Sequence, residues 1–320
     1  MIQNIKHPKR LPLDQAPLKS LKELEFLLGE NRATLWRLAD WEQNYAPFKQ
    51  GKSQKPHSIK PVSPKLRHID NPKDDLKRVQ KKILRRLLEP VKLPDYFFGA
   101  VPKRSVGCHA KRHLGTTTIV KMDIERYYPN ITARHVYKVW TAVLGCSPEI
   151  AALLTKLTTC NFYLPQSAPT SPALANLLLA SFYDPVVKIC VDLGVTTTVW
   201  VDDLTFSGPR AREVIEPARQ TFAANGFKIS RQKLEILGPR DAKHVTGPRL
   251  GLEALRASGE TLSDIRAGLF HLRCGRFTAK ETAKDVQSLQ GKVAYVRSIC
   301  PADAEVAEAE LLNIVRSPQR

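Results

Sequence analysis

The chain has 320 residues, of which 42% are hydrophobic, so it is long enough to bury a sizeable core shared by two or three subdomains. Lysine and arginine outnumber aspartate and glutamate by 50 to 31, which gives a formal net charge of +19 and favours a nucleic-acid backbone as partner. This composition excludes a disordered chain. No apolar run of about 18 residues and no secretory leader occur, so we expect a cytoplasmic protein without a membrane partner.

The six cysteines are scattered and never form a C-x-x-C pair, so neither a zinc site nor a disulfide framework is indicated. Any metal site is therefore expected to use carboxylates.

The N-terminal third predicts helices followed by a basic segment. Two short helices are expected over 13–28 and 31–45, and the lysine- and proline-rich stretch 48–65 predicts a loop or loose hairpin. Asn71 and Pro72 have the pattern of an N-cap followed by proline at the first helical position. They predict an amphipathic basic helix in NPKDDLKRVQKKILRRLLEPVK.

The centre of the chain predicts strands that alternate with helices. The expected elements, in order, are a strand over 116–124, a helix over 131–144, a long helix over 171–193 bent at Pro185, a hairpin around VWVDDLTFSG, a helix over 212–225, strands at FKIS and KLEIL, and helices over 261–273 and 278–298. This order predicts an α+β fold in which helices back one face of an antiparallel sheet.

Three aspartates are the candidate chemical groups. Asp202 and Asp203 lie between two β-prone runs, where the plainest alternative is that they only form a hairpin turn. Asp123 ends an apolar strand, where it could instead cap the turn before Pro129. A carboxylate at the end of a buried strand is costly unless it binds a cation or donors. Two strands that each present one would make a site for two Mg²⁺ ions and substrate phosphates, as nucleotidyl transfer requires.

An ordered set of motifs resembles bacterial reverse transcriptases of the retron type over about residues 56–300. DIERYYP is similar to the first catalytic-aspartate motif, PQSAPTSPALANLLL to the P-Q-G-x-x-x-S-P motif, WVDDLTFSG to the Y-x-D-D box, FKISRQKLEIL to the following lysine motif, and HVTGPRLG to the V-T-G segment. Trp200 and Ser167 depart from the usual Tyr and Gly. The resemblance implies a right-hand polymerase with fingers, a palm formed by the antiparallel sheet and its helices, and a small helical thumb.

The resemblance also implies a domain plan. It consists of an N-terminal helical extension at 1–47, fingers at 48–115, a palm at 116–250 with part of the fingers inserted at about 131–170, and a thumb with a C-terminal tail at 251–320.

The site residues that follow from the resemblance bind metal or nucleotide. Asp123, Asp202 and Asp203 would be catalytic and would hold two Mg²⁺ ions. Nucleotide contacts would come from Lys60, Arg67, Tyr128, Gln166 and Lys233, with Tyr128 as the steric gate against a 2′-hydroxyl. Alternatives remain open at several of these positions: Lys55 or Lys65 could replace Lys60, Gln166 could be an ordinary loop residue, Tyr128 a core aromatic residue, and Lys233 a solvated surface lysine.

RNA contacts are expected from the basic helix, from the segment HAKRH and from the thumb. The expected residues are Lys77, Arg78, Lys81, Lys82, Arg85, His109, His113, Lys292 and Arg297. For His109 and His113 the open alternatives are a structural role or, at their i, i+4 spacing, a metal site. For the thumb residues the alternative is a solvated helix face.

The function implied is copying part of a cognate structured non-coding RNA into branched, RNA-linked single-stranded DNA (msDNA) from deoxynucleoside triphosphates. The family's usual setting is anti-phage defence with a separate effector protein. Two rival hypotheses stay open: another bacterial reverse transcriptase, either group II intron-like or a defence polymerase, and a catalytically idle RNA-binding scaffold. Mere RNA binding would be weakened by three clustered acids, which favours catalysis over the scaffold.

Overall fold

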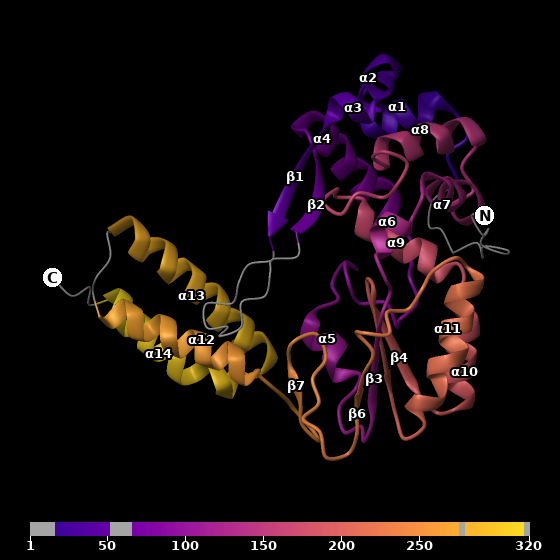
Figure 1. Cartoon of the computed structure of the whole chain (residues 1–320). Helices are drawn as coiled ribbons and strands as arrows, with labels where there is room; N and C mark the ends of the chain where they lie inside the picture. Colours follow the sequence, from indigo (N-terminus) through magenta and orange to yellow (C-terminus); the bar gives the residue numbers. More distant parts are fainter. Residues whose placement is uncertain (1–16, 52–65, 275–278, 317–320) are drawn as a thin grey trace.

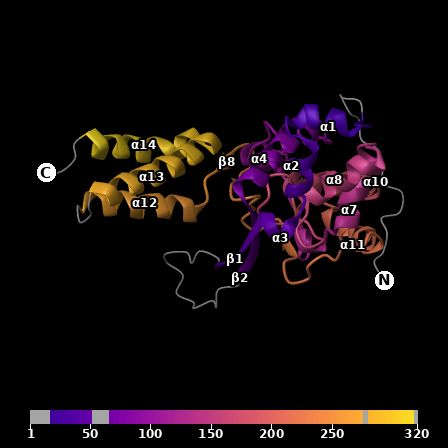
Figure 2. The same ribbon diagram turned by 90° about the horizontal axis from the view of Figure 1, so that it is seen from above.

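The computed structural model describes residues 17–51, 66–274 and 279–316. The described elements form an N-terminal helical body, a central antiparallel sheet with its covering helices, and a C-terminal helical bundle (Figure 1). Seen from above, the bundle stands to one side of the rest of the chain (Figure 2). This mixed architecture confirms the predicted α+β class.

The N-terminal body contains short helices and one hairpin. Its elements are α1 (Leu21–Leu28), α2 (Arg32–Leu38), α3 (Trp41–Asn44), β1 (Tyr45–Gly51), β2 (Leu66–Pro72), α4 (Asp74–Ile83) and a π-helical turn (Leu84–Leu88). The predicted start of the basic helix is wrong: Asn71 and Pro72 pair with β1 as the end of β2, and Lys73 is the N-cap of α4. The predicted helix over 31–45 is likewise divided, because the Asp40 side chain caps α3.

The central part supplies the sheet and most of its helices. Its elements are α5 (Val106–Lys111), β3 (Ile119–Asp123), α6 (Tyr127–Asn130), α7 (Ala133–Lys138) with a π-helical continuation (Val139–Val143), α8 (Pro148–Thr158), α9 (Ser171–Ala180), α10 (Asp184–Asp192), β4 (Thr196–Trp200), β5 (Asp203–Ser207), a 3₁₀ turn (Ala211–Val214), α11 (Ile215–Ala224), β6 (Glu235–Leu237), β7 (Arg249–Leu250) and β8 (Leu255–Arg256). The strand predicted at FKIS is wrong, because this segment makes only an isolated bridge between Ile229 and Ile124.

The predicted bend near Pro185 is confirmed, since α9 and α10 meet at 59°. Among the described residues no single helix is long and apolar enough to cross a membrane, and only this bent pair reaches that length and hydropathy together.

The central sheet has one apolar and one polar face. Its strand order is β4-β5-β3-β6 and every pairing is antiparallel. Alternate residues such as Val120, Met122 and Phe206 are almost completely buried in the main core against the helices. The opposite face carries Lys121 and Asp123, as the alternation of the strand predicts. Helices therefore cover one face fully, and the polar face is left to hold a site.

Helix α5 packs against part of this polar face through two histidines. The ring of His109 is hydrogen-bonded to the hydroxyls of Thr246 and Thr198, at 2.6 and 2.7 Å, and the ring of His113 to those of Ser207 and Thr198, both at 2.7 Å. Each residue is only 1% exposed. Burial lowers the pKa of His109 to about 4 and that of His113 to about 3, so both rings are neutral near pH 7.

These contacts correct the expectation that His109 and His113 bind RNA, because neither ring reaches the surface. All four ring nitrogens are satisfied by hydroxyl groups, which favours the structural alternative. The same contacts join the HAKRH segment to the V-T-G segment, since Thr246 belongs to the latter. The indole of Trp200 also stacks on His109 with ring centroids 5.4 Å apart, so α5 supports the end of β4.

The β4–β5 hairpin turns through only Val201 and Asp202, because Trp200 and Asp203 are register partners. Val201 has φ +60°, a left-handed conformation that is strained for a β-branched residue. The neighbouring segment 96–99 holds the hairpin, since the Phe98 amide donates to the Val199 carbonyl and the Val199 amide to that of Tyr96. Gly99 fits beneath the turn only because it lacks a side chain: a Cβ there would lie 2.7 Å from the Val201 nitrogen.

The C-terminal bundle contains α12 (Gly259–Arg273), α13 (Ala279–Ile299) and α14 (Pro301–Arg316). Helix α14 was missed, since two helices and a tail were expected. It forms because Ala304, Ala307, Leu311 and Ile314 make one apolar stripe that packs into the bundle core. The bundle meets the rest of the chain at the V-T-G segment, where the space above Gly247 is taken by the Tyr295 hydroxyl.

Replacing Gly99 by alanine is expected to lower the free energy of unfolding by about 1–3 kcal/mol, because the new methyl group would force the rigid backbone of the hairpin to move. Urea denaturation measures this change. Gly107→Ala is the matched control, since a Cβ there makes only ordinary contacts, with nearest atoms at 3.7 Å. Equal stability of the two variants would show that the hairpin can accommodate a methyl group at position 99 without cost.

Replacing Thr198 by valine is expected to lower the free energy of unfolding by about 2–3 kcal/mol. The Thr198 hydroxyl is hydrogen-bonded to the buried rings of both His109 and His113, so each ring loses a partner. Thr196→Val is the control, because Thr196 is half-exposed and on the same strand. Differential scanning calorimetry compares the two variants. A loss no greater for Thr198→Val than for Thr196→Val would contradict a structural role for the histidine network.

Candidate active site

The three candidate aspartates meet at one edge of the sheet. Asp123 is the last residue of β3 and Asp203 the first of β5, and the antiparallel register makes them direct partners. Asp202 lies in the hairpin turn, where its carbonyl accepts a hydrogen bond of 3.0 Å from the Ile124 amide. The expectation that neighbouring strands bring these acids together is therefore confirmed as geometry.

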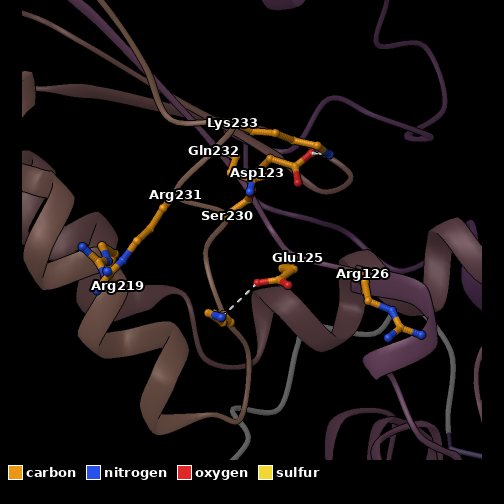
Figure 3. A pocket seen from close by; sticks show the side chains of 9 residues that line it. Asp123, Glu125, Arg126, Arg219, Ser230, Arg231, Gln232 and Lys233 are labelled. Carbon is orange, nitrogen blue, oxygen red and sulfur yellow. Dashed lines mark hydrogen bonds and ion pairs between the residues drawn. The ribbon is translucent and has the colours of Figure 1, made fainter. Parts of the chain in front are cut away.

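The acids form a strongly negative cluster that is partly neutralised by one lysine. The ammonium group of Lys233 donates to Asp123 Oδ2 at 2.6 Å, and Asp123 is only 7% exposed (Figure 3). Although Asp203 is open to solvent on one side, loss of solvation and then the charges of Asp202 and Asp123 raise its pKa to about 6. Such a cluster is favourable for binding a cation.

The donor chemistry fits a divalent metal that is completed by substrate. Carboxylate oxygens are the ligands Mg²⁺ prefers, and this ion is usually held by one or two carboxylates plus substrate phosphates. Within the described ranges no group of three or more acidic, histidine or cysteine side chains is arranged to enclose a metal by itself. The residues present therefore fit a metal shared between protein and substrate, and not a closed protein cage.

The two adjacent tyrosines have different environments. Tyr127 is 2% exposed, and its hydroxyl donates to the Ala175 carbonyl at 2.7 Å, so it belongs to the core. Tyr128 is half-buried, and desolvation followed by the charge of Asp202 raises the pKa of its hydroxyl. Of the two rings, only that of Tyr128 is close enough to solvent and to the acids to meet a substrate.

Gln166 is exposed, on a loop that is fastened to β2. The neighbouring Ser167 hydroxyl donates to the Asp70 carbonyl at 2.5 Å, and the Tyr163 hydroxyl donates to Asp70 Oδ2 at 2.7 Å. Serine in place of the usual glycine therefore makes a definite contact here. Lys60 lies outside the described residues, and Arg67 is described only by its position in β2, opposite Gln50.

The expected RNA contacts on α4 and the following π-helical turn separate into two groups. Lys82 donates to the Leu28 carbonyl and pairs with Glu30 at 2.8 Å, while Arg78 lies 3.6 Å from the same carboxylate. For these two the structure shows a role in holding the N-terminal helices. Lys77, Lys81 and Arg85 make no ion pair with any described residue, and Lys81 and Arg85 are exposed.

The expected contacts on α13 are both paired inside the bundle. Lys292 lies 3.5 Å from Asp264 of α12, and Arg297 lies 2.7 Å from Glu308 of α14. Both side chains remain partly exposed and could still reach a nucleic acid. Their contact with RNA stays a prediction.

A basic cleft beside Asp123 was missed. It has a volume of about 940 Å³, and its lining includes Arg126, Arg219, Lys228 and Arg231 together with Asp123 and Lys233 (Figure 3). Lys228 and Arg231 both belong to the segment FKISRQKLEIL, but nothing in the sequence connects them with Arg219 on α11. Their proximity depends on how α11 packs.

Comparisons with known proteins agree with this geometry. Residues 53–251 match the family model described as reverse transcriptase (RNA-dependent DNA polymerase). The chain is similar to the Retron Ec86 reverse transcriptase of Escherichia coli, with 29% identity over 238 residues, which is 73% of this chain and 72% of that protein.

Two further relatives are longer than the matched region. The Retron Se72 reverse transcriptase of Salmonella heidelberg (strain 579083-10) is 30% identical over 223 residues, covering 69% of this chain and 56% of the relative. The Retron Mx65 reverse transcriptase of Myxococcus xanthus is 29% identical over 265 residues, covering 75% and 60%. The family model covers more than half of the chain and includes all three aspartates. The chain therefore belongs to the reverse transcriptase family and is of the bacterial retron type.

Proposed function

We propose that this protein is an RNA-directed DNA polymerase that copies part of a cognate structured non-coding RNA into branched, RNA-linked single-stranded DNA. The observation that carries the proposal is the register of β3 and β5, which sets Asp123 opposite Asp203 with Asp202 in the adjoining turn. Family membership and the net charge of +19 support a nucleic-acid substrate.

The carboxylates of Asp123 and Asp202 would hold two Mg²⁺ ions, with Asp203 in support. Bound there, the ions would supply activation of the attacking hydroxyl and stabilisation of the leaving pyrophosphate. The chain's own residues position these groups: β3 and β5 fix the acids, and the hairpin keeps Asp202 at the edge. Lys233, 2.6 Å from Asp123, offsets the charge of that carboxylate and would give a proton to the leaving pyrophosphate.

The remaining nucleotide contacts would surround the acids. Tyr128, half-buried beside Asp202, would lie beneath the sugar and exclude a 2′-hydroxyl. The exposed side chain of Gln166 has donors and an acceptor for the incoming nucleotide. Arg67 and Lys60 would grip the triphosphate, since a guanidinium fork and a point charge both suit phosphate oxygens.

The three groups of elements fit the parts of a right-hand polymerase. The β1–β2 hairpin and α4 would belong to the fingers, the four-stranded sheet to the palm, and the α12–α14 bundle to the thumb. RNA would be held by shape and by phosphate contacts, for which Lys77 and Lys81 of α4 and Arg85 of the following π-helical turn are the available cations. Lys292 and Arg297 would add contacts where the bundle faces the duplex.

The proposed setting is anti-phage defence in the cytoplasm, with a separate effector protein as partner of the enzyme and its RNA-linked DNA. This part of the proposal is supported only by the retron type of the chain.

Asp202→Ala is expected to abolish DNA synthesis while leaving RNA affinity within about twofold, because the acids serve catalysis and not RNA binding. The protein is expressed with its adjacent genomic non-coding segment, and small nucleic acids are analysed before and after debranching and RNase treatment. Wild type should give a discrete RNA-linked DNA that the variant lacks.

Asp192→Ala is the control, since this exposed carboxylate ends α10 away from the site. RNA-linked DNA made by Asp202→Ala would show the metal assignment to be wrong. Mg²⁺-dependent primer extension on generic RNA without a branched product would keep the polymerase and discard the retron product.

Tyr128→Ala is expected to raise ribonucleotide incorporation relative to deoxyribonucleotide by at least about tenfold, because the ring that would exclude a 2′-hydroxyl is removed. Single-nucleotide primer extension with each substrate measures the ratio of kcat/KM values. Tyr128→Phe keeps the ring and should keep the selectivity. Unchanged sugar selectivity in Tyr128→Ala would remove Tyr128 from the gate.

A further inference from the structure

The basic cleft beside Asp123 has an ordered construction. The segment 228–233 runs along the end of β3, with the Ser230 amide donating to the Asp123 carbonyl and the Glu125 amide donating to the Lys228 carbonyl, both at 2.8 Å. This pairing fixes Arg231 and Lys233 next to Asp123. The cleft therefore begins at the carboxylate where phosphoryl transfer is proposed and continues towards α11.

Positive charge dominates the cleft. Its lining contains five cations, namely Arg126, Arg219, Lys228, Arg231 and Lys233, against the two acids Asp123 and Glu125. Lys228 is engaged by Glu125 at 3.4 Å, and Arg219 by Glu216 at 3.5 Å. Arg126 and Arg231 make no ion pair with any described residue. The cleft thus retains positive charge that its own carboxylates do not neutralise.

Two arginines line the far end of the cleft. Figure 3 shows the side chain of Arg231 extending towards that of Arg219, and both residues line the same cavity. Like charges repel, so an anion bound between or beside these two groups would relieve their repulsion. Guanidinium groups bind phosphate oxygens through paired hydrogen bonds. The cleft consequently has the chemistry of a diphosphate site.

We propose that this cleft binds the pyrophosphate released by nucleotide addition and conducts it away from Asp123. The inference rests on the proposed polymerase function. When the primer 3′-oxygen bonds to the α-phosphorus, the bond from the α-phosphorus to the bridging oxygen breaks and pyrophosphate leaves beside Lys233. Arg231 and then Arg219 continue the line of cations towards solvent.

The direction of the cleft distinguishes it from a nucleic-acid groove. Helix α11, which carries Arg219, lies on the side of the molecule away from the α12–α14 bundle in both views (Figures 1 and 2). A duplex held against the bundle would occupy the other side. The cleft therefore suits a small anion, and the two sources of that chemistry are free pyrophosphate and the β,γ-phosphates of the incoming nucleotide.

The test variant is Arg219→Gln/Arg231→Gln. The control is Arg212→Gln/Arg240→Gln, which removes two exposed arginines outside the cleft and changes the net charge equally. Primer extension on an RNA template at fixed free Mg²⁺ gives the inhibition constant for added inorganic pyrophosphate and the KM for the nucleotide. Isothermal titration with inorganic pyrophosphate, without nucleotide, gives the binding constant directly.

The cleft variant should weaken pyrophosphate inhibition and binding by about tenfold, equivalent to about 1.4 kcal/mol, and should affect pyrophosphate more than the nucleotide KM. The control should match wild type. Equal effects on pyrophosphate and KM would assign the cleft to the incoming triphosphate, and loss of primer–template affinity would assign it to nucleic acid; either result overturns the proposal.

A single Arg231→Gln variant separates loss of anion binding from altered folding. Arg231 is exposed and makes no ion pair with any described residue, so its replacement should not destabilise the fold. It should reproduce part of the effect at an unchanged melting temperature, and no effect in both variants would overturn the proposal. If wild type fails to polymerise but binds pyrophosphate through these arginines, the proposed function fails and the anion site stands.

Discussion

The antiparallel register between β3 and β5 is the constraint on which the site depends. It makes Asp123 and Asp203 direct partners and leaves only Val201 and Asp202 to form the turn into β4. A slip of one residue would move every side chain of a strand to the other face, burying the acid in the apolar core. The core residues Val120, Met122 and Phe206 therefore fix the position of the carboxylates through their own burial.

The hairpin is strained, and its neighbours maintain it. Val201 adopts a positive φ at a cost of order 1–3 kcal/mol, which persists only where surrounding contacts determine the backbone. Those contacts come from the 96–99 segment, from Gly99 beneath the turn and from Trp200 stacked on His109. His109 in turn joins Thr246, whose neighbour Gly247 meets Tyr295 of the bundle. A continuous set of contacts thus runs from the edge that carries the three aspartates to α13.

Electrostatics organises the surroundings of the acids. The cluster raises the pKa of Asp203, and Lys233 offsets part of the negative charge at Asp123. Beyond Lys233 the excess charge is positive, along the cleft towards α11. One edge of the sheet therefore presents a negative centre suited to cations beside a positive channel suited to the anion that the reaction would release.

The sequence determined those features that depend on local pattern. Alternation predicted the faces of β3, proline predicted the bend between α9 and α10, and the motif order indicated the family. Three of the elements predicted from local pattern differ in the structure, because tertiary contacts competed with the local preference. Pairing with β1 placed Asn71 and Pro72 in a strand, the apolar stripe of α14 became helical by packing in the bundle, and FKIS remained a single bridge.

For the site, local sequence pattern was enough to identify the carboxylates and to predict that strands deliver them to one edge, because strand periodicity and motif spacing are encoded locally. The roles of the other polar groups depend on tertiary contacts. The tertiary structure buried His109 and His113 against threonine and serine, paired Lys82 with Glu30, and brought Arg219 into the same cleft as Arg231. These contacts join residues distant in the chain, and their formation depends on how helices dock on the sheet, which no local pattern specifies.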